Sequence, residues 1–300
     1  MIKKNILITG FDGFLARNLV KKIDCNEYNL YGIGNSKKKY HKNFLLIKKK
    51  INSKNLNFFK KKRIDIIVHC AGSPKVGLEY NEDFKKNALT TFEILEFARS
   101  SLRKPKIIIA SSLAVYGNNY KNKIKEDFYL NPYSFYGLNK KISEEICLFY
   151  SKNFNINILI LRIASVFGIG LKKQFIYEAT KKMLSNNFNF WGSGNETRDY
   201  INIEDICEII SRSLKKNFYG SKIINCGTGN VYKTRDIIVK IKEILKINNN
   251  KLKFSGFRLK QNPKNLIPSL RKLKDFFKFK TKRDFQNDLK EFVLQQKKLH

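Results

Sequence analysis

Cysteine, histidine and proline are scarce in this 300-residue chain, which contains five, three and five of them respectively. The five cysteines are far apart and form no Cys-x-x-Cys pair, so the sequence predicts neither a structural zinc site nor a secreted disulfide framework. We expect buried free thiols and no bound metal. The longest apolar run, residues 156–170, is interrupted by polar residues and falls short of the about 20 residues of a membrane span. We therefore expect a cytoplasmic protein without a membrane span.

Acidic residues are also few, because 25 Asp and Glu stand against 60 Lys and Arg, for a net charge of +35. Such a charge can indicate a nucleic-acid partner. However, only eleven of the cations are Arg, the residue that readers of bases and phosphates favour for its bidentate fork. Much of the excess lies in residues 1–63 (+14) and 251–300 (+11). We attribute most of it to solvated surface positions and expect no nucleic-acid partner, with a polyanion partner as the alternative.

Apolar residues make up 42% of the chain, enough for a substantial core. Short apolar segments alternate with helical patterns in the first half. The predicted strands cover 4–9, 28–34, 44–47, 65–70, 106–111 and 156–163, and the clearest helices 14–23, 81–100 and 136–153. Strands that are apolar on both faces and alternate with helices indicate a parallel sheet covered on both sides. We expect an α/β fold with a Rossmann-type doubly wound parallel sheet.

The rhythm changes after Gly168, where short helical patterns and Gly-rich loops follow. We expect residues 1–168 to form an NAD(P)-binding domain, to which residues 200–226 return. Residues 169–199 and 227–300 are expected to form a smaller α/β substrate-binding cap. After Gly168 we predict helices over 174–186, 203–215, 233–245 and 282–297 and a strand over 222–226.

A glycine-rich turn follows the first predicted strand. Gly10, Gly13 and Ala16 have the spacing Gly-x-x-Gly-x-x-Gly/Ala between a strand and a helix. Small residues at these positions let the backbone approach a pyrophosphate, which the free N–H groups of the helix N-terminus can bind. The residues expected to contact the cofactor here are Gly10, Phe11, Asp12, Gly13, Phe14 and Leu15.

The second predicted strand ends at Gly34, where a dinucleotide site commonly has a carboxylate for the ribose 2′-hydroxyl. Instead, Asn35, Ser36 and Lys37 follow, and two more lysines come after them. A basic side chain accommodates a 2′-phosphate, so this segment favours NADP over NAD as the cofactor.

A tyrosine and a lysine follow the fifth predicted strand with helical spacing. Tyr136 and Lys140 are at i and i+4, so they lie on the same face of a helix. A neighbouring cation favours the phenolate, and we expect it to lower the tyrosine pKa toward a range useful for acid/base chemistry. Ser112, at the end of the fifth strand, can hydrogen-bond a substrate carbonyl or alcohol. These three residues are the predicted catalytic set.

Several motifs occur together and in order: TGFDGFLA, HCAG, SSLAVYG, Tyr136-x-x-x-Lys140, LRIASVFG, WGSGNETRDYINIEDI and NCGTGN. In this combination, over roughly residues 4–245, the chain resembles the extended short-chain dehydrogenase/reductases. Among these it is similar to the NAD-dependent epimerase/dehydratase family, which acts on nucleotide sugars. The resemblance implies that Tyr136 exchanges a proton with a sugar hydroxyl, that Lys140 binds the nicotinamide ribose, and that Ser112 orients the reacting oxygen.

The resemblance also implies further binding residues. Cofactor contacts are expected at Ile51, Cys70, Ala71, Gly72, Asn87 and Ala110, in addition to Tyr136 and Lys140. Arg198 is expected to contact the substrate diphosphate, with a structural pair to Asp199 or Asp205 as the alternative. Ser165 replaces a substrate-contacting Asn of the family, and Lys50 replaces an Asp that reaches the adenine. We expect a homodimer that binds a nucleotide-diphosphate sugar.

Departures from the family pattern limit the reaction. Dehydratases carry an Asp-Glu pair immediately after the position of Ser112, whereas this chain has Leu113 and Ala114, so a 4,6-dehydratase is not expected. A 4-epimerase and a 4-ketoreductase, both acting by hydride transfer at a sugar carbon, typically C4, remain open. A non-catalytic or RNA-binding relative of the same fold is the alternative, against which the intact Ser112, Tyr136 and Lys140 argue.

Overall fold

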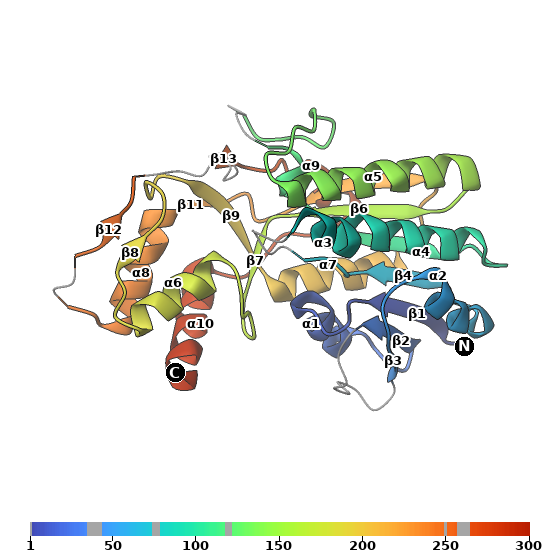
Figure 1. Cartoon of the computed structure of the whole chain (residues 1–300), viewed down its shortest axis with the longest axis horizontal. Helices are drawn as coiled ribbons and strands as arrows, with labels where there is room; N and C mark the ends of the chain where they lie inside the picture. The colour runs from blue at the N-terminus through green and yellow to red at the C-terminus, as the bar shows by residue number, and fades with distance from the viewer. Residues whose placement is uncertain (1, 35–43, 74–78, 118–121, 249–250, 257–264) are drawn as a thin grey trace.

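The computed structural model describes residues 2–34, 44–73, 79–117, 122–248, 251–256 and 265–300 (Figure 1). Seven parallel strands form its central sheet, in the order β10–β6–β5–β4–β1–β2–β3. They are β1 (Lys4–Thr9), β2 (Tyr28–Gly34), β3 (Phe44–Lys48), β4 (Ile66–His69), β5 (Lys106–Ser112), β6 (Ile158–Ile163) and β10 (Ser221–Cys226). This order reverses between β1 and β4, where doubly wound sheets bind ligands at the carboxyl ends of the strands. The predicted fold class is confirmed.

Both faces of the sheet are buried, because successive strand residues point to opposite sides. In β1, Ile6 and Ile8 lie in one core cluster and Leu7 lies in the other. Helices α1 (Phe14–Lys22), α7 (Ile203–Lys215) and α9 (Arg271–Phe277) pack in the first cluster. Helices α2 (Ser53–Leu56), α4 (Thr90–Arg99) and α5 (Phe135–Phe154) pack in the second. Each buried aliphatic side chain contributes about 1.5–3 kcal/mol, which explains why continuous apolar runs specify these strands.

The predicted helix over residues 81–100 is interrupted. It consists of α3 (Tyr80–Phe84), the π-helical turn η2 (Lys85–Leu89) and α4. The turn carries Asn87, which is fully buried and hydrogen-bonds Asp83 and Ser73. Such turns occur frequently at functional sites, and these tertiary contacts are not visible in the apolar pattern. Two 3₁₀ helices, η1 (Asn57–Lys62) and η3 (Leu113–Val115), follow α2 and β5.

A second layer of structure lies beside the sheet. In it β7 (Ser165–Phe167), β11 (Val231–Lys233) and β13 (Asn265–Leu266) all pair with β9 (Thr197–Asn202), and β8 (Asn189–Phe190) pairs with β12 (Lys253–Phe254). Helices α6 (Phe175–Leu184), α8 (Thr234–Leu245) and α10 (Phe285–Leu299) lie together at the left end of Figure 1, around a third apolar cluster. Most of these strands have two or three residues, too few for a sequence pattern.

The C-terminal segment contributes to both layers. Leu273 and Phe277 of α9, which the sequence did not predict as a helix, are buried in the cluster against the sheet. Residues 266–279 therefore pack on the first domain, although the sequence assigned 227–300 to the cap. We propose the predicted division into two domains, with residues 266–279 moved to the first domain. The predicted return of the chain to the first domain is kept for α7 and β10 (203–226), because α7 packs on the sheet and β10 pairs with β6.

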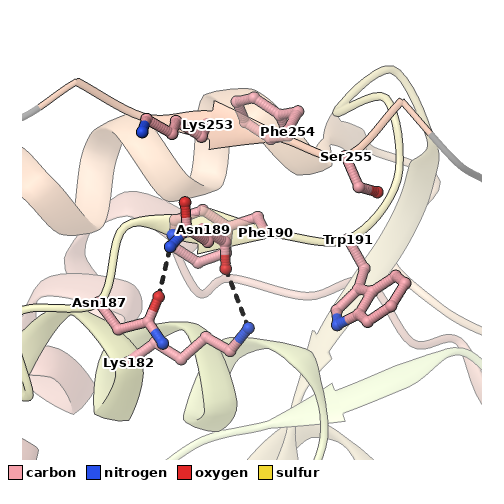
Figure 2. A pocket seen from close by; sticks show the side chains of 8 residues that line it. All are labelled: Lys182, Asn187, Asn189, Phe190, Trp191, Lys253, Phe254 and Ser255. Carbon is pink, nitrogen blue, oxygen red and sulfur yellow. Dashed lines mark hydrogen bonds between the residues drawn. The ribbon is translucent and has the colours of Figure 1, made fainter.

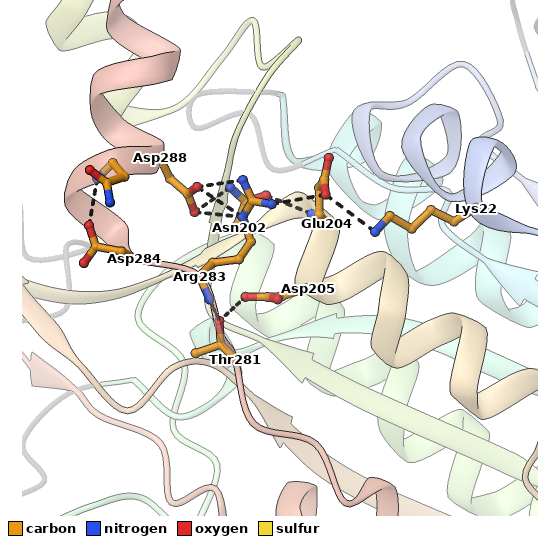
Figure 3. A network of polar contacts seen from close by, with 9 residues as sticks. Lys22, Asn202, Glu204, Asp205, Thr281, Arg283, Asp284 and Asp288 are labelled. Atoms are coloured by element: carbon orange, nitrogen blue, oxygen red, sulfur yellow. Dashed lines mark hydrogen bonds and ion pairs between the residues drawn. The ribbon is translucent and has the colours of Figure 1, made fainter.

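A polar network ties the last helix to the sheet domain (Figure 3). The Arg283 guanidinium is paired with Asp288 of α10 at 2.7 Å and with Glu204 of α7 at 3.2 Å. Glu204 also lies 3.5 Å from the Lys22 ammonium of α1, and Asn202 donates a hydrogen bond to Asp288. The network thus connects the cap to α1, the helix that follows the glycine-rich turn.

All five cysteines are free thiols, and three of them, Cys147, Cys207 and Cys226, are buried. In the described part of the chain, no helix combines the length and the apolarity that crossing a membrane would require. Within the same residues, no group of three or more His, Cys, Asp or Glu side chains could hold a metal ion.

Candidate active site

The glycine-rich turn lies between the carboxyl ends of β1 and β4. Gly10 has a φ of +63°, and a Cβ atom on it would come within 2.7 Å of the Ala71 Cα, so only glycine fits. The Gly13 N–H donates to the Gly10 carbonyl at 2.8 Å, and Gly13 is the N-cap of α1 without a side-chain cap. The first turn of α1 contains no acidic residue. This backbone cradle and helix N-terminus fit the pyrophosphate of a dinucleotide.

The remaining residues of the turn reach the end of β2. Phe11 is buried and packs edge-on against Phe44 of β3, with ring centroids 5.9 Å apart. The Asp12 carboxylate lies against Gly34, where a Cβ atom would be 2.7 Å from its Oδ1. A carboxylate therefore stands at the end of β2, but the glycine-rich turn supplies it. The predicted contacts Asn35, Ser36 and Lys37 lie outside the described residues.

Ser112, Tyr136 and Lys140 come together where β5 ends and α5 begins. Ser134 starts α5 by accepting a hydrogen bond from the Gly137 N–H at 3.0 Å. Gly137 packs so closely on η3 that a Cβ atom would lie 2.5 Å from the Ala114 carbonyl oxygen. This contact brings the half-buried Tyr136 to Ser112, whose hydroxyl hydrogen-bonds its phenol. The three predicted catalytic residues are thus neighbours.

Lys140 is buried behind the tyrosine. Its Nζ donates to the Ala110 carbonyl at 2.9 Å and lies 5.9 Å from the Tyr136 ring centroid. Burial lowers the pKa of Lys140 to about 8. Burial raises the pKa of Tyr136 to about 12, the hydrogen bond with Ser112 lowers it, and Asp83 raises it. The expectation of a lowered Tyr136 pKa is therefore wrong for this structure, because burial outweighs the other effects.

The end of β4 carries Cys70, Ala71 and Gly72. Ala71 is buried and its N–H donates to Thr9 Oγ1 at 3.3 Å. A Cβ atom on Gly72 would lie 2.7 Å from Asn87 Oδ1 and 3.2 Å from Lys140 Nζ. Gly72, Asn87 and Lys140 therefore share one small space. Burial raises the pKa of Cys70 to about 12, so its thiol is neutral at pH 7.

His69, which precedes Cys70, holds this strand end in place. Its ring is buried and hydrogen-bonded to Thr9 at 2.8 Å and to Thr91 at 3.2 Å. Burial and the Lys140 ammonium lower its pKa to about 3, so it is a neutral structural group. Ile51, another predicted contact, packs beside the second core cluster after β3, and Lys50 before it is exposed.

A buried ion pair lies next to the three predicted catalytic residues. Glu144, one helical turn beyond Lys140, accepts from the Arg162 guanidinium of β6 at 2.7 Å, and both side chains are almost inaccessible. Ser111, next to Ser112, donates to the same carboxylate. Arg162 also donates to the Tyr116 hydroxyl at 2.7 Å. Neither Glu144 nor Arg162 was among the predicted site residues, although charged residues on a buried strand and on a helix face are the signal of such a pair.

The predicted substrate residues lie on another sheet. Ser165 opens β7, where it pairs with Tyr200 of β9, and Arg198 lies two residues earlier on β9. Arg198 and Ser165 are therefore on adjacent strands, separate from β5 and α5. Asp199, the alternative partner of Arg198, accepts hydrogen bonds from the backbone and hydroxyl of Thr228 and from Gly229. Asp205, the other alternative, accepts from Thr281.

A hollow of about 320 Å³ lies in the cap (Figure 2). It is lined by Lys182, Asn187, Asn189, Phe190, Trp191, Lys253, Phe254 and Ser255. Lys182 donates to the Asn189 carbonyl at 2.9 Å, so its charge is held against the backbone. None of the predicted site residues lines this hollow, and we assign the chemistry to the end of the central sheet.

The family model described as "NAD dependent epimerase/dehydratase family" matches residues 6–227. A "Putative UDP-glucose 4-epimerase" of Methanocaldococcus jannaschii is 31% identical over 245 residues, which are 75% of this chain and 77% of the relative. A dTDP-D-glucose 4,6-dehydratase of Dictyostelium discoideum is 30% identical over 270 residues, which are 79% of this chain and 61% of the relative.

Solved structures agree with this result. The UDP-glucose 4-epimerase of Thermotoga maritima, with UDP-glucose, matches with a TM-score of 0.89 at 25% identity. The match covers 99% of this chain and 100% of the epimerase chain. The UDP-glucuronic acid 4-epimerase of Bacillus cereus, with UDP-glucuronic acid and NAD, has a TM-score of 0.88 at 25% identity and the same coverage. The resemblance found in the motifs is confirmed: the chain belongs to the NAD dependent epimerase/dehydratase family.

Proposed function

We propose that the protein is a nucleotide-sugar 4-epimerase, with a 4-ketoreductase acting on a 4-keto nucleotide sugar as the second candidate. The main support for this proposal is that Ser112, Tyr136 and Lys140 lie close together, next to Gly10 and Gly72 at the ends of β1 and β4. The similar structures with bound UDP-glucose or UDP-glucuronic acid support a nucleotide-diphosphate sugar as the substrate.

The proposed roles follow from the geometry. The Tyr136 phenol exchanges a proton with the sugar 4-hydroxyl, and Ser112, which already hydrogen-bonds that phenol, holds the reacting oxygen. Lys140 directs its ammonium to the space beside Gly72, where it can bind a ribose hydroxyl. Arg198, a cation on β9, binds the substrate diphosphate, and Ser165 lies beside it on β7. The nicotinamide cofactor supplies the hydride acceptor when bound.

We infer that the cofactor is NAD, although the segment after Gly34 favoured NADP in the sequence. Asp12 places its carboxylate against Gly34, at the end of β2. A carboxylate at this position can accept a hydrogen bond from a ribose 2′-hydroxyl and repels a 2′-phosphate. The NAD bound in the similar Bacillus cereus structure supports this choice.

Epimerisation is favoured over elimination of water. Leu113 and Ala114 occupy the two positions after Ser112, and Leu113 is buried. Neither can protonate a leaving hydroxyl, so a 4,6-dehydratase is excluded from the proposal even though dehydratases occur among the relatives. An epimerase returns the hydride to the same carbon and recovers its cofactor, whereas a ketoreductase consumes one NADPH or NADH per turnover.

The purified protein should therefore contain NAD and convert UDP-glucose or UDP-glucuronic acid to the 4-epimer without added cofactor. Nucleotide analysis after heat denaturation and chromatography of the sugar products measure both results. An empty site, and consumption of added NADPH only when a 4-keto nucleotide sugar is the substrate, would replace the epimerase by the ketoreductase. No conversion of any nucleotide sugar under either condition would contradict the proposed function.

We also propose that the protein acts in the cytoplasm, supported by its five free thiols, and that it is a homodimer. Phe84, Leu89, Phe92 and Phe149 are large apolar side chains exposed along α3–α4 and α5. Phe92 contacts Tyr150, the neighbour of Phe149, which places both exposed phenylalanines on the outer side of the α4–α5 pair. Apolar side chains gathered in this way are typical of an interface with another protein.

Light scattering should therefore give twice the chain mass of 35.2 kDa. The double variant Phe92→Lys/Phe149→Lys should shift the protein toward the monomer, because it would bury charges in the interface. Val239→Lys, a change at a similarly exposed apolar residue of α8, is the control and should leave the mass unchanged. A monomeric native protein would contradict the proposal.

The high positive charge leaves RNA binding as a separate possibility to test. We expect negligible retention of RNA on filters at physiological salt, because the enzyme proposal needs no such partner. Tight binding with a steep decrease as salt rises would instead favour the RNA-binding alternative.

A further inference from the structure

Asp83 is a buried carboxylate that the proposed mechanism does not use. It is the fourth residue of α3 and is 4% exposed. Its Oδ1 accepts hydrogen bonds from Asn87 Nδ2 at 2.5 Å and from Asn139 Nδ2 at 3.2 Å. An ionised carboxylate can only accept, so these bonds fix the orientation of both amides. The Asn87 Oδ1 is thereby turned to the Ser73 N–H, 3.2 Å away.

Both amides lie beside the acid/base pair. Asn139 is fully buried and precedes Lys140 in α5, three residues after Tyr136. Asn87 Oδ1 borders the same space next to Gly72 as the Lys140 ammonium. Asp83 thus connects the π-helical turn that carries Asn87 with the part of α5 that carries the catalytic residues.

The negative charge of Asp83 also affects the buried ammonium of Lys140. The Lys140 ammonium is 6% exposed, and a buried charge is costly unless an opposite charge compensates it. The titratable groups that face it are His69 and Cys70 at the end of β4, Asp83 on α3, and Tyr136, Glu144 and Cys147 on α5.

Most of these groups cannot balance the ammonium. Burial lowers the pKa of His69 to about 3, raises the pKa values of Cys70 and Tyr136 to about 12 and raises that of Cys147, so these four groups are neutral at pH 7. Glu144 is paired with the Arg162 guanidinium at 2.7 Å. The described donors to the Asp83 carboxylate are neutral amides, so its charge adds to that of Glu144 in favouring the Lys140 ammonium.

We propose that Asp83 is a positioning residue of the acid/base pair, which fixes the Asn87 and Asn139 amides and supplies a negative charge that favours the Lys140 ammonium. This inference rests on the proposed function only in naming Tyr136 and Lys140 as that pair. The negative charge of Asp83 acts to raise the pKa values of both Tyr136 and Lys140. It therefore favours the protonated form of each.

The test is a titration of Lys140 by NMR on protein with ¹³C-labelled lysine, with its signal assigned by the loss of that signal in Lys140→Met. Asp83→Asn removes the charge at nearly constant volume and can still accept a hydrogen bond. We expect its Lys140 midpoint to fall by about half a pH unit, because an opposite charge that favours the ammonium is removed. Glu82→Gln, which removes a charge from the exposed side of the same helix, should leave the midpoint unchanged.

Asp83→Glu keeps the charge and separates electrostatics from packing. We expect its Lys140 midpoint to stay at the wild-type value, and this variant decides the question if Asp83→Asn does not fold. An unchanged midpoint in Asp83→Asn, or a lowered one in Asp83→Glu, would overturn the inference. The titration requires no turnover, so failure of the sugar assay would contradict the proposed function and leave this result standing.

Discussion

Replacing Tyr136 by Phe is expected to reduce turnover of the nucleotide sugar by about a thousandfold or more. The change removes only the hydroxyl that hydrogen-bonds Ser112 and that we assign to proton exchange. General acid/base catalysis by one group contributes about 10²–10⁴-fold, and no second group of the described site replaces the phenol. Steady-state kinetics measure the loss in kcat. Circular dichroism and binding of NAD should be unchanged, because the ring and Lys140 remain.

Tyr219→Phe is the matched control for this prediction. It removes the same atom from a side chain that is 89% exposed and lies near the amino ends of β1 and β4, at the opposite edge of the sheet. We expect its kcat to equal that of the wild type. A Tyr136→Phe enzyme that keeps a tenth or more of wild-type activity would show that the proton is exchanged elsewhere.

Much of the fold could be predicted from the chain because its strands are buried on both faces. The predicted bounds 4–9, 28–34 and 203–215 agree with β1, β2 and α7, where apolar runs or a clear helical period end at polar or Gly residues. Strands of two or three residues and α9 carry no such pattern. The turn η2 was missed because the apolar pattern does not show the contacts of Asn87, which lies in the turn and is hydrogen-bonded to Asp83.

The site was predictable to a similar extent. Tyr136 and Lys140 could be found because helical spacing places them on one face, and Ser112 because it ends a strand. Asp83 and Glu144 could not, since their roles depend on partners 56 and 18 residues away, Asn139 and Arg162. The Tyr136 pKa was predicted in the wrong direction because the sequence shows the neighbouring cation but not the burial.

Breaking the ion pair between Glu144 and Arg162 should have the largest effect on stability. Both side chains are nearly inaccessible, and Glu144 also accepts from Ser111, while Arg162 donates to Tyr116. Glu144→Gln keeps the shape but leaves the guanidinium charge uncompensated in the core. Removing one partner of a buried pair costs about 3–5 kcal/mol, so we expect a loss of this size in the free energy of unfolding, measured by urea titration.

Two further variants test whether the cost comes from the uncompensated charge. Glu145→Gln removes a carboxylate from the exposed neighbouring position and should change the unfolding free energy by less than about 0.5 kcal/mol. The double variant Glu144→Leu/Arg162→Met removes both charges and should be more stable than Glu144→Gln, since apolar replacement of a whole buried pair is often neutral. Because Tyr116 and the Glu126 carbonyl lose the donor Arg162, recovery should be partial. A double variant less stable than Glu144→Gln would show that the hydrogen bonds of Arg162, and not charge compensation, hold β6 against α5.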